Sequence, residues 1–263
     1  MIVRAQNLVL PGATDVNAPM FGIDSIVTDG LITVTATANY PKSNLANPAT
    51  FLKWQNSAAT ATNMTLAVTT GYINYVGVAA HNLGTIGAAI TIQGDSGDGY
   101  VDLTTVVTPP NDQPLIFLFT RHQYVGIRLV LGAGSAAHEM AVLYVGDKLL
   151  SQRNIYVGHN PITLNPRLNV VNGRSENGQF LGRIIVGERR ETSVELSELS
   201  PMWVRGNLMP FLTAAKARPF FFAWRPANYS TEVGFCWLTS DPVVTNSRAN
   251  GMMSTTLNMA GIA

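Results

Sequence analysis

The sequence has few charged residues, a single cysteine and no long apolar run. Lysine, arginine, aspartate and glutamate together make up 13% of the 263 residues, about half of the ~25% that is usual in soluble domains. Such a sparsely charged surface is expected where other chains cover part of it, and equally in a monomeric β protein with a weakly charged surface. The net charge of +1 argues against a dedicated nucleic-acid binder, which needs clustered basic residues.

Cysteine and membrane signals are equally scarce. Cys236 is the only cysteine, so no disulfide can form within the chain, and its apolar neighbours indicate a buried, unreactive thiol. No basic segment followed by an apolar run opens the chain, which argues against a secretion signal. No apolar run approaches the ~20 residues of a membrane-spanning helix. We therefore expect a protein that is made and assembled in a cytoplasm and has no membrane segment.

The sequence also lacks the motifs of common catalytic and metal sites. Its four histidines are scattered and none belongs to a His-Glu-x-x-His pair, and neither a Gly-x-Ser-x-Gly elbow nor a phosphate-binding loop is found. Four glutamates lie close together but alternate with arginines, which favours a charge-balanced surface over paired acids for glycoside cleavage: Glu188, Glu191, Glu195 and Glu198. The sequence predicts no enzyme activity, catalytic residue, metal or cofactor.

Alternating and β-branched residues dominate the first half of the chain. Runs typical of strands occur at 31–37, 63–69, 73–79, 88–93, 100–107, 115–119, 124–131 and 140–145. Glycine, proline and asparagine separate them, and Asp95–Gly99 is a hairpin turn in this interpretation rather than a calcium loop. Short strands at this spacing, with no helical pattern between them, predict a β-sandwich or jelly roll.

The second half combines further strands with one helix. Strand-like runs occur at 168–171, 180–186, 192–196, 220–224, 234–238 and 253–259. Ser200 followed by Pro201 is typical of a helix start, and Pro210 inside the apolar pattern predicts a kink or two short helices. Residues 1–148 carry a net charge of −3 and residues 149–263 one of +4. We therefore predict two domains, 1–148 and 149–263.

Both halves resemble parts of a known protein family. The second half contains Tyr156–Leu164, Gly173–Arg183, Ala217–Pro226, Glu232–Trp237 and Met253–Ala260, and this series resembles the belt domain of distal tail proteins of long-tailed bacteriophages. In the first half, Tyr72–Gly84 and then Asp95–Gly99 are similar to the strand-and-loop order of a discoidin/galectin-type sandwich. Such a sandwich accompanies the belt in many distal tail proteins, and residues 1–10 are candidates to pair back with the belt.

The resemblance implies a mainly β protein with an N-terminal β-sandwich followed by a β-rich belt domain that contains one helix. It implies a structural virion protein at the tail tip that forms a ring, most often a hexamer, between the tail tube and the baseplate. The implied partners are other copies of this chain, the tail tube protein, the tail-tip hub, and receptor-binding or fibre proteins. A closed ring needs a heterologous interface that is buried all the way round, and sheet edges can pair between subunits.

Candidate packing residues follow from the apolar pattern of the second half. Consecutive apolar residues in the 220–224 strand indicate that both of its faces are covered, by a helix and by a neighbouring layer or subunit. We expect the belt core or subunit packing to include Trp203, Phe211, Phe220, Phe221, Phe222, Trp224 and Trp237. Arginine is enriched at interfaces, so candidate ion pairs between subunits involve Arg174, Arg183, Arg190, Arg218 and Arg225.

Carbohydrate binding is the main alternative function. Sugar pockets combine an aromatic platform with a few polar groups, and the first half offers Trp54, His81, Asn82 and Arg121 as candidates to contact a host glycan. A tail or surface adhesin would use such a pocket, whereas a structural sandwich would serve as a spacer in which His81 and Asn82 cap a turn. A hydrolase acting on cell-wall sugar is a third hypothesis.

Overall fold

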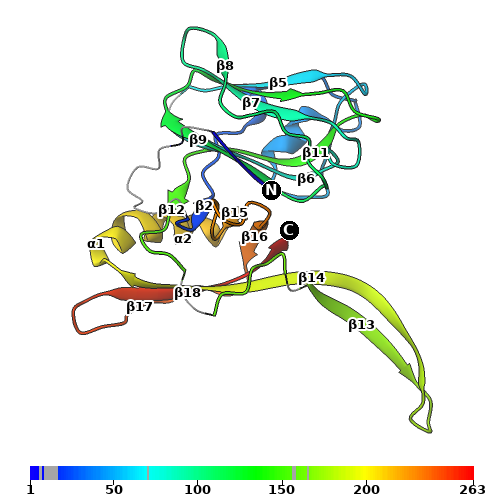
Figure 1. Ribbon diagram of the computed structural model, residues 1–263, viewed down its shortest axis with the longest axis vertical. Coiled ribbons are helices and arrows are strands. Elements are labelled where there is room, and N and C mark those ends of the chain that lie inside the picture. The colour runs from blue at the N-terminus through cyan, green and yellow to red at the C-terminus, as the bar shows by residue number, and fades with distance from the viewer. Residues whose placement is uncertain (6–7, 9–16, 70, 156–157, 165) are drawn as a thin grey trace.

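The computed structural model describes residues 1–5, 8, 17–69, 71–155, 158–164 and 166–263. This part of the chain is mainly β with one helical stretch, as the sequence predicts. Two sheets form a sandwich, and a third sheet lies against it together with the helix (Figure 1).

The sandwich comes from the first half of the chain. One of its sheets has the order β1-β9-β6-β11-β4, with the bounds Ile2–Arg4, Leu115–His122, Ile73–His81, Glu139–Gly146 and Trp54–Gln55. The other sheet has the order β3-β5-β10-β7-β8, with the bounds Ile32–Thr33, Thr62–Ala67, Gly126–Leu131, Ile90–Asp95 and Tyr100–Asp102. Two 3-10 turns, Asp29–Leu31 and Lys42–Ala46, precede β4. Val76, Phe117, Ile92 and Leu129 are among the apolar side chains buried between these sheets.

The third sheet combines the second half of the chain with one early strand. Its order is β12-β2-β15-β16-β18-β14-β13, with β17 paired to β18; the bounds are Leu149–Leu150, Met20–Gly22, Phe220–Ala223, Val233–Leu238, Met253–Ile262, Phe180–Leu199, Pro166–Arg174 and, for β17, Val244–Asn246. The sequence offered residues 1–10 as candidates to pair with the belt; Ile2–Arg4 instead pair in parallel with β9 of the sandwich, while the Ile2 N–H donates to the Ser230 carbonyl in the second half of the chain. Residues 6–7 and 9–10 lie outside the described residues. The early strand that joins the third sheet is β2.

The helical stretch begins where the sequence predicts. The Ser200 hydroxyl accepts a hydrogen bond from the Trp203 N–H, and α1 (Pro201–Trp203) passes into a π turn over Val204–Leu208 and then α2 (Met209–Ala215). In the π turn the Met209 N–H donates to the Val204 carbonyl, five residues back. Proline lacks an N–H and clashes with the carbonyl four residues before it, so a wider turn ahead of Pro210 accommodates the ring without splitting the helix.

The sandwich and the third sheet share an apolar core. Alternate residues of β15 face opposite ways, so Phe220 and Phe222 pack toward the helix while Phe221 packs against the sandwich. Gly77 of β6 makes this possible, because a Cβ there would lie 2.5 Å from the Phe221 ring. The Tyr144 hydroxyl also crosses the boundary and donates to the Pro219 carbonyl (3.0 Å). The expected burial of both faces of β15 is therefore found, and the neighbouring layer is this chain's own sandwich.

Two local predictions have different outcomes. Asp95–Gly99 forms the expected hairpin turn between β7 and β8, where the Asp95 carboxylate accepts hydrogen bonds from the N–H groups of Gly97 and Gly99. The separate strands predicted at 180–186 and 192–196 are one strand, β14. Charged residues between the two apolar runs resemble a loop in the sequence, but they remain in the strand because they stay paired with β13 and β18.

Candidate functional site

A β-hairpin arm projects from the third sheet. The first half of β14 pairs only with β13, whereas the second half pairs with β18 inside the sheet. In Figure 1 this hairpin curves away from the body of the molecule. We call β13 and residues 180–189 of β14 the arm. At ~3.3 Å per residue, its ten-residue strand reaches about 30 Å.

Apolar side chains on the arm are exposed on both of its faces. Ile184 pairs with Val171 and Ile185 pairs with Val170 across the two strands. Because successive side chains of a strand point to opposite faces, each face carries one of these apolar pairs. Large apolar side chains of the arm are between 49% and 69% exposed: Leu168, Val171, Phe180, Leu181, Ile184, Ile185 and Val186.

An isolated two-stranded hairpin is marginally stable in water, and exposed apolar patches of this kind mark interaction sites. The arm also carries charge, because residues 166–189 contain four arginines and two glutamates, a net charge of +2. Residues 1–148 carry a net charge of −3. The arm therefore has the properties of a segment that another chain covers, and copies of this chain offer the opposite charge.

The predicted intersubunit arginines lie at several places. Arg183 donates to Asn172 within the arm, Arg190 pairs with Glu188 at 2.8 Å, Arg218 lies 3.7 Å from Asp24, and Arg225 lies over the Trp224 ring. Arg174 is exposed near the tip of the arm and has no ion-pair partner among the described residues. Four of the five thus have partners in their own chain, and ion pairs between subunits remain a prediction.

The predicted packing residues divide by exposure. Phe211, Phe220, Phe221 and Phe222 are buried in the core of the third sheet or at its boundary with the sandwich. Trp203 and Trp224 are partly buried at the edge of that core, and the Trp224 indole N–H donates to Glu232. Trp237 is 43% exposed, so it remains a candidate to pack against another subunit.

Three of the four predicted glycan contacts form hydrogen bonds with other residues of the sandwich. Trp54 has 0% exposure and its indole N–H donates to the Thr35 carbonyl, so its ring offers no platform to a sugar. The buried His81 ring accepts from the Leu83 N–H and also contacts the Gln113 carbonyl (2.9 Å). Asn82 donates to Ala137 and accepts from the Glu139 N–H. His81 and Asn82 thus fix turns, which is the alternative that the sequence offered.

Arg121 does not converge with those residues. His81 and Trp54 both lie opposite Met140 at the start of β11, whereas Arg121 lies near the far end of β9, where His122 pairs with Ile73. Its guanidinium pairs with Asp147 (2.7 Å) and stacks over the Tyr72 ring (3.8 Å). Arg121 instead lines a pocket that the sequence did not predict.

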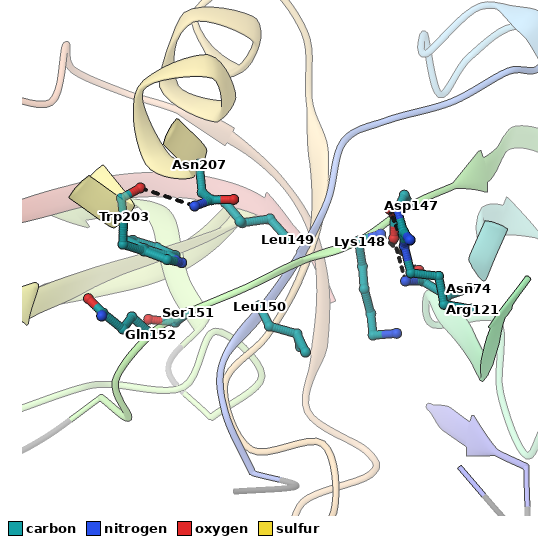
Figure 2. Close-up of a pocket in the computed structure, with 10 residues that line it drawn as sticks. All are labelled: Asn74, Arg121, Asp147, Lys148, Leu149, Leu150, Ser151, Gln152, Trp203 and Asn207. Atoms are coloured by element: carbon teal, nitrogen blue, oxygen red, sulfur yellow. Dashed lines mark hydrogen bonds and ion pairs between the residues drawn. The ribbon is translucent and has the colours of Figure 1, made fainter. Parts of the chain in front are cut away.

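The pocket lies where the sandwich, β12 and the helix meet (Figure 2). Its volume is about 420 Å³, within the ~300–1,000 Å³ typical of ligand sites. The lining combines the Trp203 indole, two leucines and several polar side chains: Asn74, Arg121, Asp147, Lys148, Leu149, Leu150, Ser151, Gln152, Trp203 and Asn207. The π turn positions Asn207, whose amide donates to the Trp203 carbonyl and whose side-chain oxygen remains available.

Other candidate chemistry is not assembled in the described part of the chain. No group of three or more histidine, cysteine, aspartate or glutamate side chains is placed there to hold a metal ion. Cys236 is buried and burial raises the pKa of its thiol well above the ordinary range. Three of the four clustered glutamates pair with arginines, at Glu188–Arg190, Glu191–Arg167 and Glu198–Arg248. None of the described helices is long and apolar enough to span a membrane.

No protein-family model and no curated protein sequence matches this chain. Solved structures match about half of it. A chitosan-binding module from a chitosanase/glucanase of Paenibacillus sp. IK-5 is 12% identical, with a TM-score of 0.40 over 47% of this chain and 98% of the module. The CBM32 module of AlyQ, solved with 4,5-unsaturated mannuronic acid, is 13% identical, with a TM-score of 0.38 over 47% and 96%. Likenesses this low assign no ligand to this chain.

Sequence reasoning missed the pocket for a physical reason. Asp147 and Lys148 follow the glycine that ends β11, so the sequence predicts a domain boundary there. No residue pattern close to them in the sequence indicates a ligand site. Asn74, Arg121 and Trp203 come from three distant segments that only the fold brings together. The one available signal is an Asp-Lys pair at the junction of two domains, where ligand sites are common.

Proposed function

We propose that this chain is a non-enzymatic assembly protein whose arm is covered by neighbouring copies, in a ring at the tip of a bacteriophage tail. The observation that carries the proposal is the arm, with apolar pairs on both faces and no covering element among the described residues. A heterologous contact, in which the arm of one subunit lies on another part of the next, propagates around an axis and forms a ring when the rotation between neighbours closes.

The charges support contact between copies. The arm is basic and the half of the chain that forms the sandwich is acidic, so an arm is attracted to a neighbour's sandwich and not to a neighbour's arm. The resemblance to distal tail proteins supplies the further partners, namely the tail tube, the hub, and the receptor-binding or fibre proteins, and the virion as the location. The belt domain would form the ring, with the sandwich on its outside.

The test is the assembly state of the purified chain. We expect mass photometry and electron microscopy at high concentration to show rings with a central hole. The double variant Ile184→Glu/Ile185→Glu places a charge on each face of the arm and should leave a folded monomer. Val101→Glu is the matched control, because Val101 is 60% exposed on β8 of the sandwich. A wild-type chain that stays monomeric, or an arm variant that still forms rings, contradicts the proposal.

Carbohydrate binding is a second candidate function, and the pocket favours it. Trp203 provides an indole in a cavity of suitable size, and Asn207 adds a free side-chain carbonyl. Sugar sites combine an aromatic surface with a few polar groups in this manner. The proposal moves the glycan contact from Trp54, His81 and Asn82 to this pocket, where Arg121 is the one shared residue. Calorimetric titration of the chain with sugars tests whether the pocket binds carbohydrate.

A further inference from the structure

The pocket contains a largely buried lysine, Lys148, whose ammonium makes no hydrogen bond or ion pair with the described residues. Lys148 is 8% exposed, and its one hydrogen bond to a side chain of the described residues runs from its backbone N–H to Asn74. Asp147 and Arg121 act on its ammonium through their charges, and these two effects oppose each other. In Figure 2 the Lys148 side chain extends away from the bonded group formed by Asp147, Arg121 and Asn74. A buried charge is costly unless it is paired, so this amine calls for an anionic partner.

The carboxylate of the neighbouring Asp147 does not form an ion pair with the Lys148 ammonium. Asp147 accepts from Arg121 through one oxygen, at 2.7 Å, and from the Asn74 amide through the other. The three charged groups of the pocket, Lys148, Arg121 and Asp147, therefore sum to +1. A ligand with a single negative charge would balance the pocket.

The other free polar groups lie at the opposite end. The Trp203 indole N–H and the Asn207 side-chain carbonyl have no other hydrogen-bond partner among the described residues, and both line the same cavity as Lys148. Gln152 is already bonded twice to Ser200. The cavity thus offers a cation at one end, and an aromatic ring with one donor and one acceptor at the other, separated by Leu149 and Leu150 (Figure 2).

We propose that the pocket binds an acidic sugar, with the carboxylate on the Lys148 ammonium and the sugar ring against Trp203. This assignment rests on the second proposed function and specifies its ligand class. A neutral sugar would leave the ammonium unpaired, and a simple carboxylate would leave Trp203 and Asn207 unused. Uronic acids carry both features, a single carboxylate and a hydroxyl-bearing ring.

The test is calorimetric titration of the full chain at pH 7 with D-glucuronate, D-glucose and acetate. We expect glucuronate to bind more tightly than either of the others. Lys148→Met should weaken glucuronate binding roughly ten- to hundredfold, the range for losing a hydrogen bond to a charged group, while leaving glucose binding unchanged. Lys216→Met, which removes an exposed lysine outside the pocket, should bind glucuronate as the wild type does.

Each failure has a distinct meaning. If no sugar binds, the carbohydrate function itself is wrong and this inference is wrong with it. If glucose binds as tightly as glucuronate, the carbohydrate function stands and the acidic preference is refuted. If acetate binds as tightly as glucuronate, the pocket is an anion site and not a sugar site.

A second measurement uses the unmodified protein. Asp24, whose carboxylate lies 3.7 Å from Arg218, lines the adjoining cavity with Lys148. Burial lowers the pKa of Lys148 to about 8, with Asp147 raising it and Arg121 lowering it further. Glucuronate binding should therefore weaken between pH 7 and pH 9.5 while glucose binding does not change. Glucuronate affinity that is equal at the two pH values would refute the role of Lys148.

Discussion

The buried Lys148 should lower the free energy of unfolding of the unliganded protein, so that a variant with an apolar side chain at this position is more stable. Burial lowers the pKa of this amine from 10.5 to about 8. At 1.36 kcal/mol for each pH unit, this difference corresponds to about 3 kcal/mol at neutral pH. Lys148→Met keeps a long unbranched side chain and removes the charge, so we expect the variant to be up to about 3 kcal/mol more stable at pH 7.

The stability of the wild-type chain should change with pH because Lys148 loses its proton at a lower pH in the folded chain than in the unfolded chain. Between pH 8 and pH 10.5 the unfolded chain holds the Lys148 proton while the folded chain does not, so wild-type stability rises with pH in that window. The destabilisation is complete below pH 8 and absent above 10.5. The advantage of Lys148→Met should therefore be greatest at pH 7 and should disappear by pH 10.5.

The assay is urea denaturation followed by tryptophan fluorescence at pH 7 and pH 10, without ligand. Lys216→Met is the control, because its exposed ammonium should give a difference near zero at both pH values. A Lys148→Met variant that is no more stable than the wild type at pH 7 would refute the reasoning. So would a stability gain of equal size at the two pH values, because it would come from packing and not from charge.

Three further predictions concern packing and capping. Gly77→Ala should lower the free energy of unfolding by about 1–3 kcal/mol, because its Cβ would meet the Phe221 ring. Gly187→Ala is the control, because the space around Gly187 is open, and it should change the melting temperature little. Equal losses of melting temperature in the two variants would argue against the close contact. Ser200→Ala should cost about 1 kcal/mol by removing the helix cap, measured by denaturant unfolding, and no loss would mean that the cap is not needed. Cys236 should react with a thiol reagent only in denaturant, and rapid labelling of the folded chain would contradict its burial.

Local sequence rules predict the features that depend on neighbouring residues. The Asp95 turn and the Ser200 cap follow from side chains that bond to backbone groups two to four residues away, so the sequence alone identifies them. The burial of both faces of β15 also follows from its run of consecutive apolar residues.

Features set by distant parts of the chain escape such rules. Trp54 has the residue type of a sugar platform, but the fold encloses it and bonds it to Thr35. Lys148 looks like an ordinary charged residue after a strand, and only the packing of the helix and the sandwich around it produces a buried amine. The length of β14 is misjudged because the arm has no core of its own and therefore shows no simple hydrophobic alternation.

The shared apolar layer determines how this chain could be divided for experiment. Tyr75, Ile116 and Val142 on the sandwich lie in one cluster with Met20, Phe221 and Phe235 of the third sheet. A sandwich expressed by itself would present this face to water and would tend to aggregate. Soluble fragments should therefore require polar replacements on that face, and a foreign sandwich grafted onto the third sheet would need a glycine where the Phe221 ring enters.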